Sequence, residues 1–269
     1  MDLSRYNHFN RGKKILVIPD LHVKHYERAE TLDRLYAINQ MIKQERPDIV
    51  VFLADVIDFM SCRDSIDRVD GDAVMSDLIL FTEVLSRIMS NLKRLKIDFY
   101  FCEGNHEERF RRRPENKMLG HDYVQKIVES FGIIWVPFLR TLYLEGIGFS
   151  HYMKAGSSRR AASITAMDNG KVSYFCGHEH TNDVRMGVRG DGVRYTVGKL
   201  GGFWHMTQEE KEAKLWSGLT ILTDVTGNGQ CSVHQYPYDH VLEKYGKETY
   251  ALGLRRAADF YEDQEKAFA

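Results

Sequence analysis

The sequence is poor in the residues that mark disulfide-rich or low-complexity proteins. Its 269 residues include only 5 prolines and 4 cysteines, and no repeat or low-complexity tract is present. The cysteines are far apart and form no CxxC pair, which argues against a disulfide scaffold and favours reduced thiols. Hydrophobic residues make up 43% of the chain and charged residues 28%, as in a soluble globular protein with a sizeable core. We therefore expect one domain over residues 1–269.

The sequence also lacks an excess of one charge and a long apolar run. Acidic and basic residues number 38 and 37, so the overall field favours neither nucleic acid nor an anionic membrane as the partner. The first residues, MDLSRYNHFNRGKK, are polar, and no later segment approaches the length of a bilayer-spanning run. We expect a cytoplasmic protein without a membrane partner, and the sequence does not indicate an oligomeric state.

Apolar runs alternate with helical periodicity in the first half of the chain. Short apolar runs at 14–19, 49–53 and 97–102 predict strands. Between them, residues 27–46 and 74–95 carry apolar side chains at helical spacing. The order strand, helix, strand, helix, strand predicts parallel strands joined by right-handed crossovers.

The second half of the chain is dominated by strand-like segments. These lie at 133–152, 172–176 and 193–197. Two further runs, 219–225 and 230–236, flank the sequence Thr-Gly-Asn-Gly and predict a hairpin. We therefore expect more antiparallel sheet here, followed by an amphipathic helix over 250–268.

Metal-ligating residue types follow the predicted strands at five places. They are Asp20 and His22 in IPDLH, Asp55 and Asp58 in LADVID, Asn105 and His106 in CEGNHE, His151 in FSHY, and His178 and His180 in CGHEH. Loops at strand ends are where a rigid sheet holds functional side chains. One histidine alone is more often structural than a ligand, but five such fragments in this order indicate a metal site.

The order and residue types of these fragments resemble the calcineurin-like metallophosphoesterase superfamily, whose pattern is DxH, GDxxD, GNH(D/E), a separate His, and GHxH. The resemblance spans Asp20 to His180. Ala54 departs from the pattern because it replaces the glycine before the first aspartate of GDxxD, and we expect a slightly altered loop there. The resemblance implies an α/β fold, a four-layer α-β-β-α sandwich of mixed sheets flanked by helices, with the metal site at the strand ends.

The resemblance also implies two divalent metal ions bridged by Asp55. By matched position, one ion would be held by Asp20, His22, Asp55 and His180, and the other by Asp55, Asn105, His151 and His178. A carboxylate suits the bridge because each of its oxygens can bind one cation. Imidazoles, carboxylates and an amide without thiolates suit Mn, Fe or Zn better than Mg or Ca. We expect manganese first, with iron, zinc or nickel as alternatives.

Hydrolysis of a phosphodiester or phosphomonoester is the reaction that this resemblance implies. The attacking group would be a hydroxide between the metals, because cations lower the pKa of bound water from ~15.7 towards ~7. His106 would protonate the leaving group, and Asp58 would orient His106. The sequence has neither a GxSxG elbow nor a reactive cysteine motif that would favour a covalent nucleophile instead.

Arginines near the motifs are candidate substrate ligands. Arg109 follows GNHEE, and Arg159 and Arg160 follow FSHY within KAGSSRR. Arginine suits phosphate because its planar fork donates two hydrogen bonds, although such runs can equally be solvated faces. Phe59 stands where protein phosphatases of this superfamily place an arginine, which favours a nucleotide or nucleic-acid substrate. The alternatives are a phosphoprotein phosphatase and a non-catalytic nucleic-acid-binding scaffold.

Three aromatic residues, Phe203, Trp204 and His205, follow a pair of glycines. Such residues can stack on a base, as aromatic platforms do for single strands, or line a pocket. Packing in the core is the commoner fate of residues of this kind.

Overall fold

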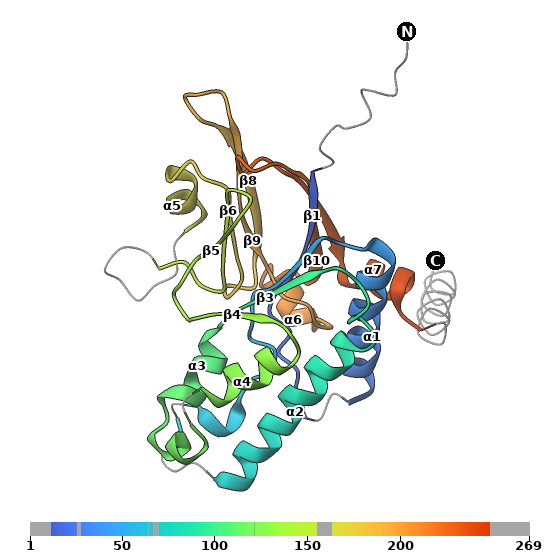
Figure 1. Ribbon diagram of the computed structural model, residues 1–269, viewed down its shortest axis with the longest axis vertical. Coiled ribbons are helices and arrows are strands. Elements are labelled where there is room, and N and C mark those ends of the chain that lie inside the picture. The colour runs from blue at the N-terminus through green and yellow to red at the C-terminus, as the bar shows by residue number, and fades with distance from the viewer. Residues whose placement is uncertain are drawn as a thin grey trace, which may run out of the picture.

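The computed structural model describes residues 12–25, 28–63, 65–66, 70–120, 122–154 and 163–247 (Figure 1). The strands are β1 (Lys13–Ile18), β2 (Ile49–Phe52), β3 (Asp98–Cys102), β4 (Ile134–Val136), β5 (Leu142–Leu144), β6 (Ile147–Ser150), β7 (Tyr174–Cys176), β8 (Asn182–Val188), β9 (Arg194–Leu200), β10 (Gly218–Val225) and β11 (Ser232–Pro237). The helices are α1 (Arg28–Glu45), η2 (Met60–Cys62), α2 (Gly71–Met89), α3 (Asn105–Arg112), η3 (Pro114–Leu119), α4 (Tyr123–Ser130), α5 (Ile164–Asn169), α6 (Gln208–Glu212) and α7 (Tyr238–Tyr245).

The first sheet contains the parallel strands that the sequence predicted. Its order is β11-β10-β1-β2-β3-β4, in which β1 to β4 run parallel and β10 and β11 are antiparallel. Strand β2, with the sequence IVVF, is buried along its whole length, as expected for a strand covered on both faces. Helices α1 and α2 make the crossovers from β1 to β2 and from β2 to β3.

The second sheet lies against the first and is mixed. Its order is β5-β6-β7-β9-β8, with β6, β7 and β9 parallel and β5 and β8 antiparallel. Val17 and Val51 of the first sheet and Phe149 and Phe175 of the second belong to one buried cluster, which is the core between the sheets. Apolar burial of this kind is the dominant stabilising term in such a fold.

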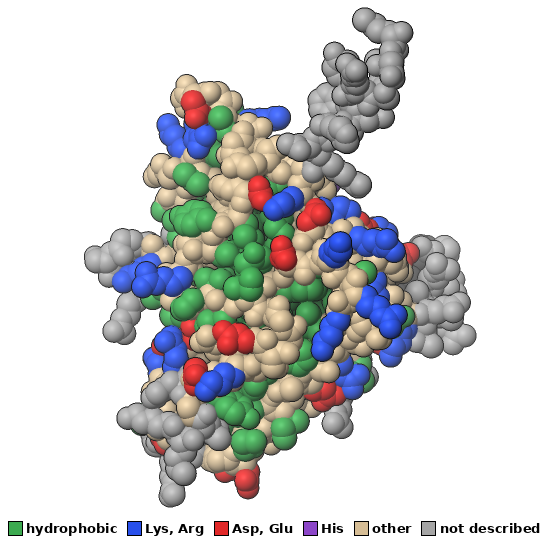
Figure 2. Space-filling view, in the orientation of Figure 1, with side chains coloured by type: hydrophobic (Ala, Val, Ile, Leu, Met, Phe, Trp, Pro, Cys, Tyr) green, Lys and Arg blue, Asp and Glu red, His purple; other side chains and the backbone are tan. Residues whose placement is uncertain are grey.

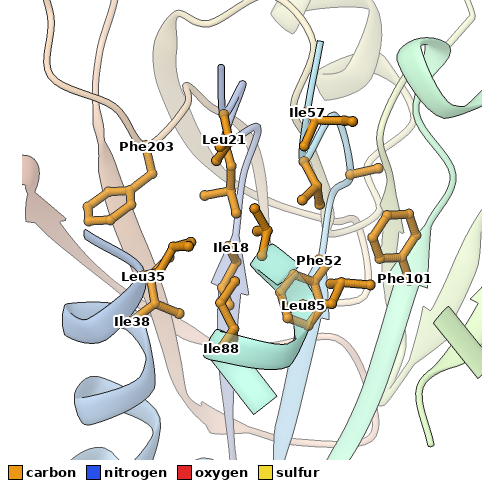
Figure 3. Close-up of a cluster of buried hydrophobic side chains, with 14 of the residues drawn as sticks. Ile18, Leu21, Leu35, Ile38, Phe52, Ile57, Leu85, Ile88, Phe101 and Phe203 are labelled. Carbon is orange, nitrogen blue, oxygen red and sulfur yellow. The ribbon is translucent and has the colours of Figure 1, made fainter. Parts of the chain in front are cut away.

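Helices complete the sandwich on both outer faces. The larger core joins the first sheet to α1, α2, α4 and α7, and includes Ile38, Phe52 and Leu85 (Figure 3). On the second sheet, helix α5 packs by Ile164 and Met167 (Figure 1). The layers are therefore helix, sheet, sheet, helix, which confirms the expected α-β-β-α architecture of mixed sheets.

Local boundaries differ from the expectation in several places. Helix α2 begins earlier, because the Asp70 side chain caps it by accepting from the Asp72 N–H, and it ends at Met89, before Asn91 takes a left-handed φ of 60°. The region 133–152 forms three short strands rather than one. Helices α3 and α4 were not expected. The predicted helix over 250–268 lies outside the described residues.

The surface reflects the balanced composition. Figure 2 shows basic and acidic side chains interspersed on one face, with hydrophobic side chains between them. In the described part of the chain, no helix combines the length and apolar character needed to cross a membrane.

The topology explains where functional side chains gather. Strands β1, β2 and β3 are parallel in the first sheet, and β6 and β7 are parallel in the second. Each is followed within a few residues by one of the predicted motifs. Carboxyl ends of parallel strands form the usual crevice of α/β proteins, so the two sheets present these motifs to a common site.

Candidate metal centre

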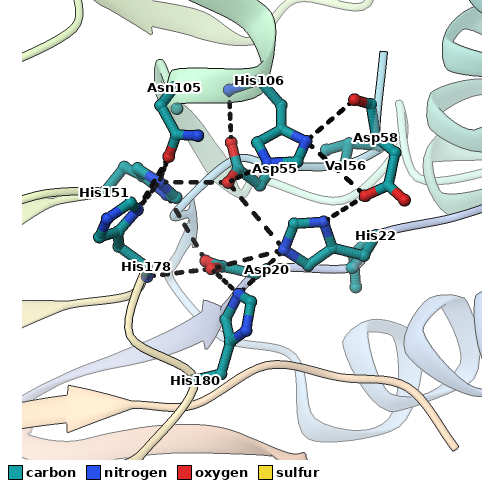
Figure 4. A network of polar contacts seen from close by, with 12 residues as sticks. Asp20, His22, Asp55, Val56, Asp58, Asn105, His106, His151, His178 and His180 are labelled. Carbon is teal, nitrogen blue, oxygen red and sulfur yellow. Dashed lines mark hydrogen bonds and ion pairs between the residues drawn. The ribbon is translucent and has the colours of Figure 1, made fainter. Parts of the chain in front are cut away.

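The nine side chains singled out after the strands converge on one site (Figure 4). Their potential ligand atoms form three groups, each with all atoms within 4.8 Å of one another. The groups are Asp20, His22 and His180; His22, Asp55 and His106; and Asp55, His151 and His178. Residues as far apart as Asp20 and His180, 160 positions in the sequence, are therefore brought into direct contact by the fold.

The first group is a carboxylate facing two imidazoles. Asp20 Oδ2 lies 3.1 Å from His180 Nε2, which in turn lies 2.9 Å from His22 Nε2. His22 Nδ1 donates to Asp58 Oδ1 at 2.7 Å, which directs Nε2 of His22 towards the site and His180. Asp20 is fully buried, and its Oδ1 has no hydrogen-bond partner among the described residues. That oxygen lies 3.5 Å from His151 Nδ1, while Oδ2 is the oxygen that faces the two imidazoles.

The third group, Asp55, His151 and His178, is equally directed. His151 Nδ1 donates to the Leu53 carbonyl at 2.6 Å, which turns Nε2 towards Asn105 Oδ1 at 2.9 Å and Asp55 Oδ2 at 3.3 Å. His178 Nδ1 lies 2.8 Å from the same Asn105 oxygen. A backbone carbonyl that fixes the tautomer of a ligating imidazole is the usual support of a metal ligand.

The charge of the site favours a cation. Burial lowers the pKa of His151, but the carboxylates of Asp55 and Asp20 outweigh burial and raise that pKa to about 10. Although burial raises it, His151 and His180 hold the pKa of Asp20 below its usual range. Two ionised carboxylates in a buried site attract a proton or a divalent ion alike.

The backbone of the site is held in conformations that favour glycine. His22, Asp55, His178 and His180 have φ values of 45°, 43°, 71° and 55°. Each such residue costs about 1–2 kcal/mol, so surrounding bonds must hold it. The Asp55 carbonyl does so for His22 by accepting its N–H at 2.9 Å. Ala54, at the family's glycine position, has φ 70°, so it keeps the conformation of a glycine in spite of its side chain.

Glu107 was not singled out from the sequence, yet it organises the loop of Asp55. Its carboxylate is 1% exposed and accepts from the N–H groups of Asp55 at 3.1 Å, Val56 at 3.0 Å and Gly104 at 3.2 Å. Burial and the charge of Asp55 raise the pKa of Glu107 to about 8. A Cβ on Gly104 would lie 2.1 Å from Asp55 Oδ1, so this position needs glycine. In the sequence, the only indication of this role was that Glu107 is the acidic fourth residue of the GNHE motif.

The contacts of Asp58 differ from the predicted pairing. Its carboxylate lies 2.7 Å from His22 Nδ1 but 3.6 Å from His106 Nδ1. His106 Nδ1 instead lies 3.0 Å from the Asp58 carbonyl. Asp58 thus contacts both histidines, with its carboxylate on His22 and its backbone on His106. Burial is the main cause that lowers the pKa of His106, to about 4.

The arginines after GNHEE have separate surroundings. Arg111 pairs with Glu103 at 3.3 Å and Arg112 with Glu108 at 2.6 Å. Arg113 donates to backbone carbonyls after η2. Arg109 lies one turn after His106 on α3, and its charge contributes to the lowered pKa of that imidazole. The other two predicted substrate ligands, Arg159 and Arg160, lie outside the described residues.

A pocket of about 260 Å³ opens at the first group. Among the described residues, it is lined by His22, Lys24, Asp58, His106, His180, Trp204 and Glu210. Lys24 and Glu210 were not singled out from the sequence, because neither belongs to a motif.

Several solved structures and one family model are similar to this chain. A phosphoesterase from E. coli, YfcE, is similar over 84% of this chain and 99% of its own, with 15% identity and a TM-score of 0.39. TT1561 of Thermus thermophilus covers 83% of this chain and 99% of its own, with 8% identity and a TM-score of 0.42. Chaetomium thermophilum Vps29 covers 85% and 97%, with 12% identity and a TM-score of 0.37. No curated protein sequence matches significantly. The family model described as calcineurin-like phosphoesterase matches residues 13–182, which is more than half of the chain, and the protein therefore belongs to that family.

Proposed function

We propose that this protein is a dinuclear metal-dependent phosphoesterase that hydrolyses a phosphodiester or phosphomonoester of a nucleotide or nucleic acid. Family membership implies a metal-dependent phosphoesterase in general. The observation that carries the finer proposal is the pair of directed ligand groups on either side of Asp55. The fully buried Asp20 carboxylate, whose Oδ2 lies 3.1 Å from His180 Nε2 and 3.9 Å from His22 Nε2, supports a cation at the first group.

The contacts support the ligand sets that the family pattern implies. Asp20, His22, Asp55 and His180 would hold one ion, and Asp55, Asn105, His151 and His178 the other. The donors are imidazoles, carboxylates and one amide oxygen, a set that fits a divalent transition metal. We propose manganese first, with iron, zinc or nickel as alternatives. When bound, the ions would polarise the ester and supply the nucleophile from water.

The side chains of the chain would then position the reactants. Asp58 fixes His22 through a 2.7 Å hydrogen bond, and the Leu53 carbonyl fixes His151. His106 faces the same pocket and is the candidate for protonating the leaving oxygen. Its pKa is about 4, so it needs the negative charge of a bound phosphate to favour the protonated form. Arg109, one turn further on α3, would contact a phosphate oxygen.

The surroundings of Phe59 speak against a phosphoprotein substrate. Its side chain is 1% exposed and packs against Phe81 and Phe110 in the core, so position 59 offers nothing to a phosphate. A nucleotide or the end of a nucleic acid is therefore the substrate class we propose. An idle scaffold is disfavoured because every predicted ligand type is present and directed at the site.

Hydrolysis of simple esters tests this function. We expect manganese-loaded protein to release p-nitrophenolate from bis(p-nitrophenyl) phosphate or p-nitrophenyl phosphate, and the preferred compound distinguishes a diesterase from a monoesterase. Asp55→Asn and His106→Ala should abolish turnover with the circular dichroism spectrum unchanged. Asp239→Asn and His240→Ala, exposed on α7, are the matched controls and should retain turnover. Full activity in both site variants would reject the proposal.

A further inference from the structure

Trp204 forms one wall of the pocket at the metal centre. Its ring centroid lies 5.7 Å from that of His22 and 4.9 Å from that of His180, with nearly perpendicular planes at 84° and 76°. Its neighbour Phe203 is fully buried in the core, and His205 is exposed. Of the three aromatic residues in this segment, Trp204 is the one that lines the pocket.

The indole is held by its edges. A Cβ on Gly202 would lie 1.7 Å from Cζ3 of Trp204, so the benzo edge rests on the glycine backbone. At the opposite edge, Nε1 donates to Glu210 Oε2 at 3.4 Å, and Glu210 is itself fixed by the Thr207 N–H at 2.8 Å. Ser217 Oγ accepts from the Trp204 N–H at 2.9 Å and donates to its carbonyl at 2.6 Å. With both edges in contact and two imidazoles packed perpendicular to it, the indole has little side-chain freedom left to lose on binding.

The pocket suits a phosphate that carries a planar polar group. At about 260 Å³ it is smaller than a usual ligand pocket of roughly 300–1,000 Å³, so it encloses the phosphate and the group next to it. Beside Trp204, the lining includes a cation, Lys24, and a carboxylate acceptor, Glu210. A nucleobase offers a π face to the indole and N–H donors to a carboxylate, whereas a sugar phosphate or an alkyl ester offers no aromatic ring.

We infer that Trp204 determines specificity at this site by stacking on the base of a nucleoside-bearing phosphate ester. This inference rests on the proposed function, and it adds the residue and the contact by which a nucleotide is preferred. Stacking of one base on an aromatic side chain changes affinity by roughly 5- to 100-fold.

Substrate pairs that share a released product isolate the contribution of the base. Thymidine 5′-(p-nitrophenyl phosphate) and methyl p-nitrophenyl phosphate both release p-nitrophenolate, and AMP and ribose 5-phosphate both release inorganic phosphate. The assay uses the diester pair if the manganese-loaded protein hydrolyses diesters, and the monoester pair if it hydrolyses monoesters. We divide kcat/KM for the nucleoside ester by kcat/KM for the base-free ester. We expect Trp204→Leu to lower this ratio roughly 10-fold or more, chiefly by raising KM for the nucleoside ester. Trp204→Phe should retain most of the ratio. Trp216→Phe, an indole outside the pocket, is the matched control and should not change it. An unchanged ratio in Trp204→Leu overturns the inference.

Fluorescence provides a readout that needs no turnover. In the manganese-loaded His106→Ala protein, we expect AMP to quench indole emission at concentrations where ribose 5-phosphate does not. In the double variant that carries both His106→Ala and Trp204→Phe, we expect AMP to cause no such quenching. If the wild-type protein hydrolyses no ester while AMP still quenches indole emission in this assay, the proposed function is rejected and the role of Trp204 is supported. Hydrolysis without base-dependent quenching would reject the role of Trp204 and leave the proposed function standing.

Discussion

Glu107 is the buried carboxylate on which the loop of Asp55 depends, and Glu107→Gln tests that dependence. One carboxylate oxygen accepts from two N–H groups, those of Asp55 and Gly104, and the other accepts from Val56. Glutamine has a single acceptor oxygen. When that oxygen keeps the first two bonds, the side-chain NH₂ group faces the Val56 N–H and leaves it without an acceptor.

The expected loss follows from this geometry. One buried donor without a partner costs about 1–3 kcal/mol in unfolding free energy. For a chain of this length, about 3 °C per kcal/mol gives a fall in Tm of about 3–9 °C. Because the loop carries the bridging carboxylate, manganese affinity should fall roughly 10-fold, as for other groups that orient ligands. Calorimetry of melting and of manganese binding, at a pH above 8 where Glu107 is ionised, measures both quantities.

A neighbouring variant provides the control. Glu108 pairs with Arg112 at 2.6 Å on the surface of α3, and such a pair contributes only about 0.3–0.5 kcal/mol. Glu108→Gln should therefore melt within about 2 °C of the wild type and bind manganese normally. If the two variants melt together and bind manganese equally, Glu107 does not support the loop, and our interpretation of the site is wrong.

Three further predictions concern metal, pH and a buried ion pair. Dialysis against EDTA should lower the Tm, because ions at 100 times Kd stabilise the folded state by about 2.7 kcal/mol; an unchanged Tm would argue against a structural role for the ions. Burial raises the pKa of Glu45, but hydrogen bonds led by that of Tyr245 outweigh burial and lower it below 4.5. Ionised Glu45 therefore stabilises the fold above pH 4.5, and this contribution is lost as the pH falls through the folded-state pKa of Glu45. In urea unfolding, we expect Glu45→Gln to be less stable than the wild type at pH 7 and the difference to shrink at about pH 3. The Lys199 side chain is 9% exposed and pairs with Glu179, which stands in the sequence between the candidate ligands His178 and His180. Glu179→Gln should lower the urea midpoint more than Lys199→Met, because the first leaves a nearly buried ammonium unpaired; the reverse order would count against the pair.

Sequence patterns were enough for the architecture around the site. Continuous apolar runs predicted β1, β2 and β3, and helical spacing predicted α1 and α2, because strands buried on both faces and amphipathic helices leave strong local patterns. The shorter elements were less accessible. Helix α3 consists mainly of charged residues and begins inside a ligand motif, so its periodicity gave little indication.

Residue type and order in the chain alone determined the family and the set of candidate ligands, since an Asp or His after each strand is a local feature. Their roles as metal ligands stay predictions until the metal is measured. Only the tertiary structure decided which groups meet: the carboxylate of Asp58 on His22 rather than His106, Glu107 under the Asp55 loop, and Trp204 at the pocket wall. These contacts join residues 36 to more than 180 positions apart. The pairing of β1, β2 and β3 sets the first two distances, and the packing of the second sheet sets that of Trp204; no local pattern encodes either.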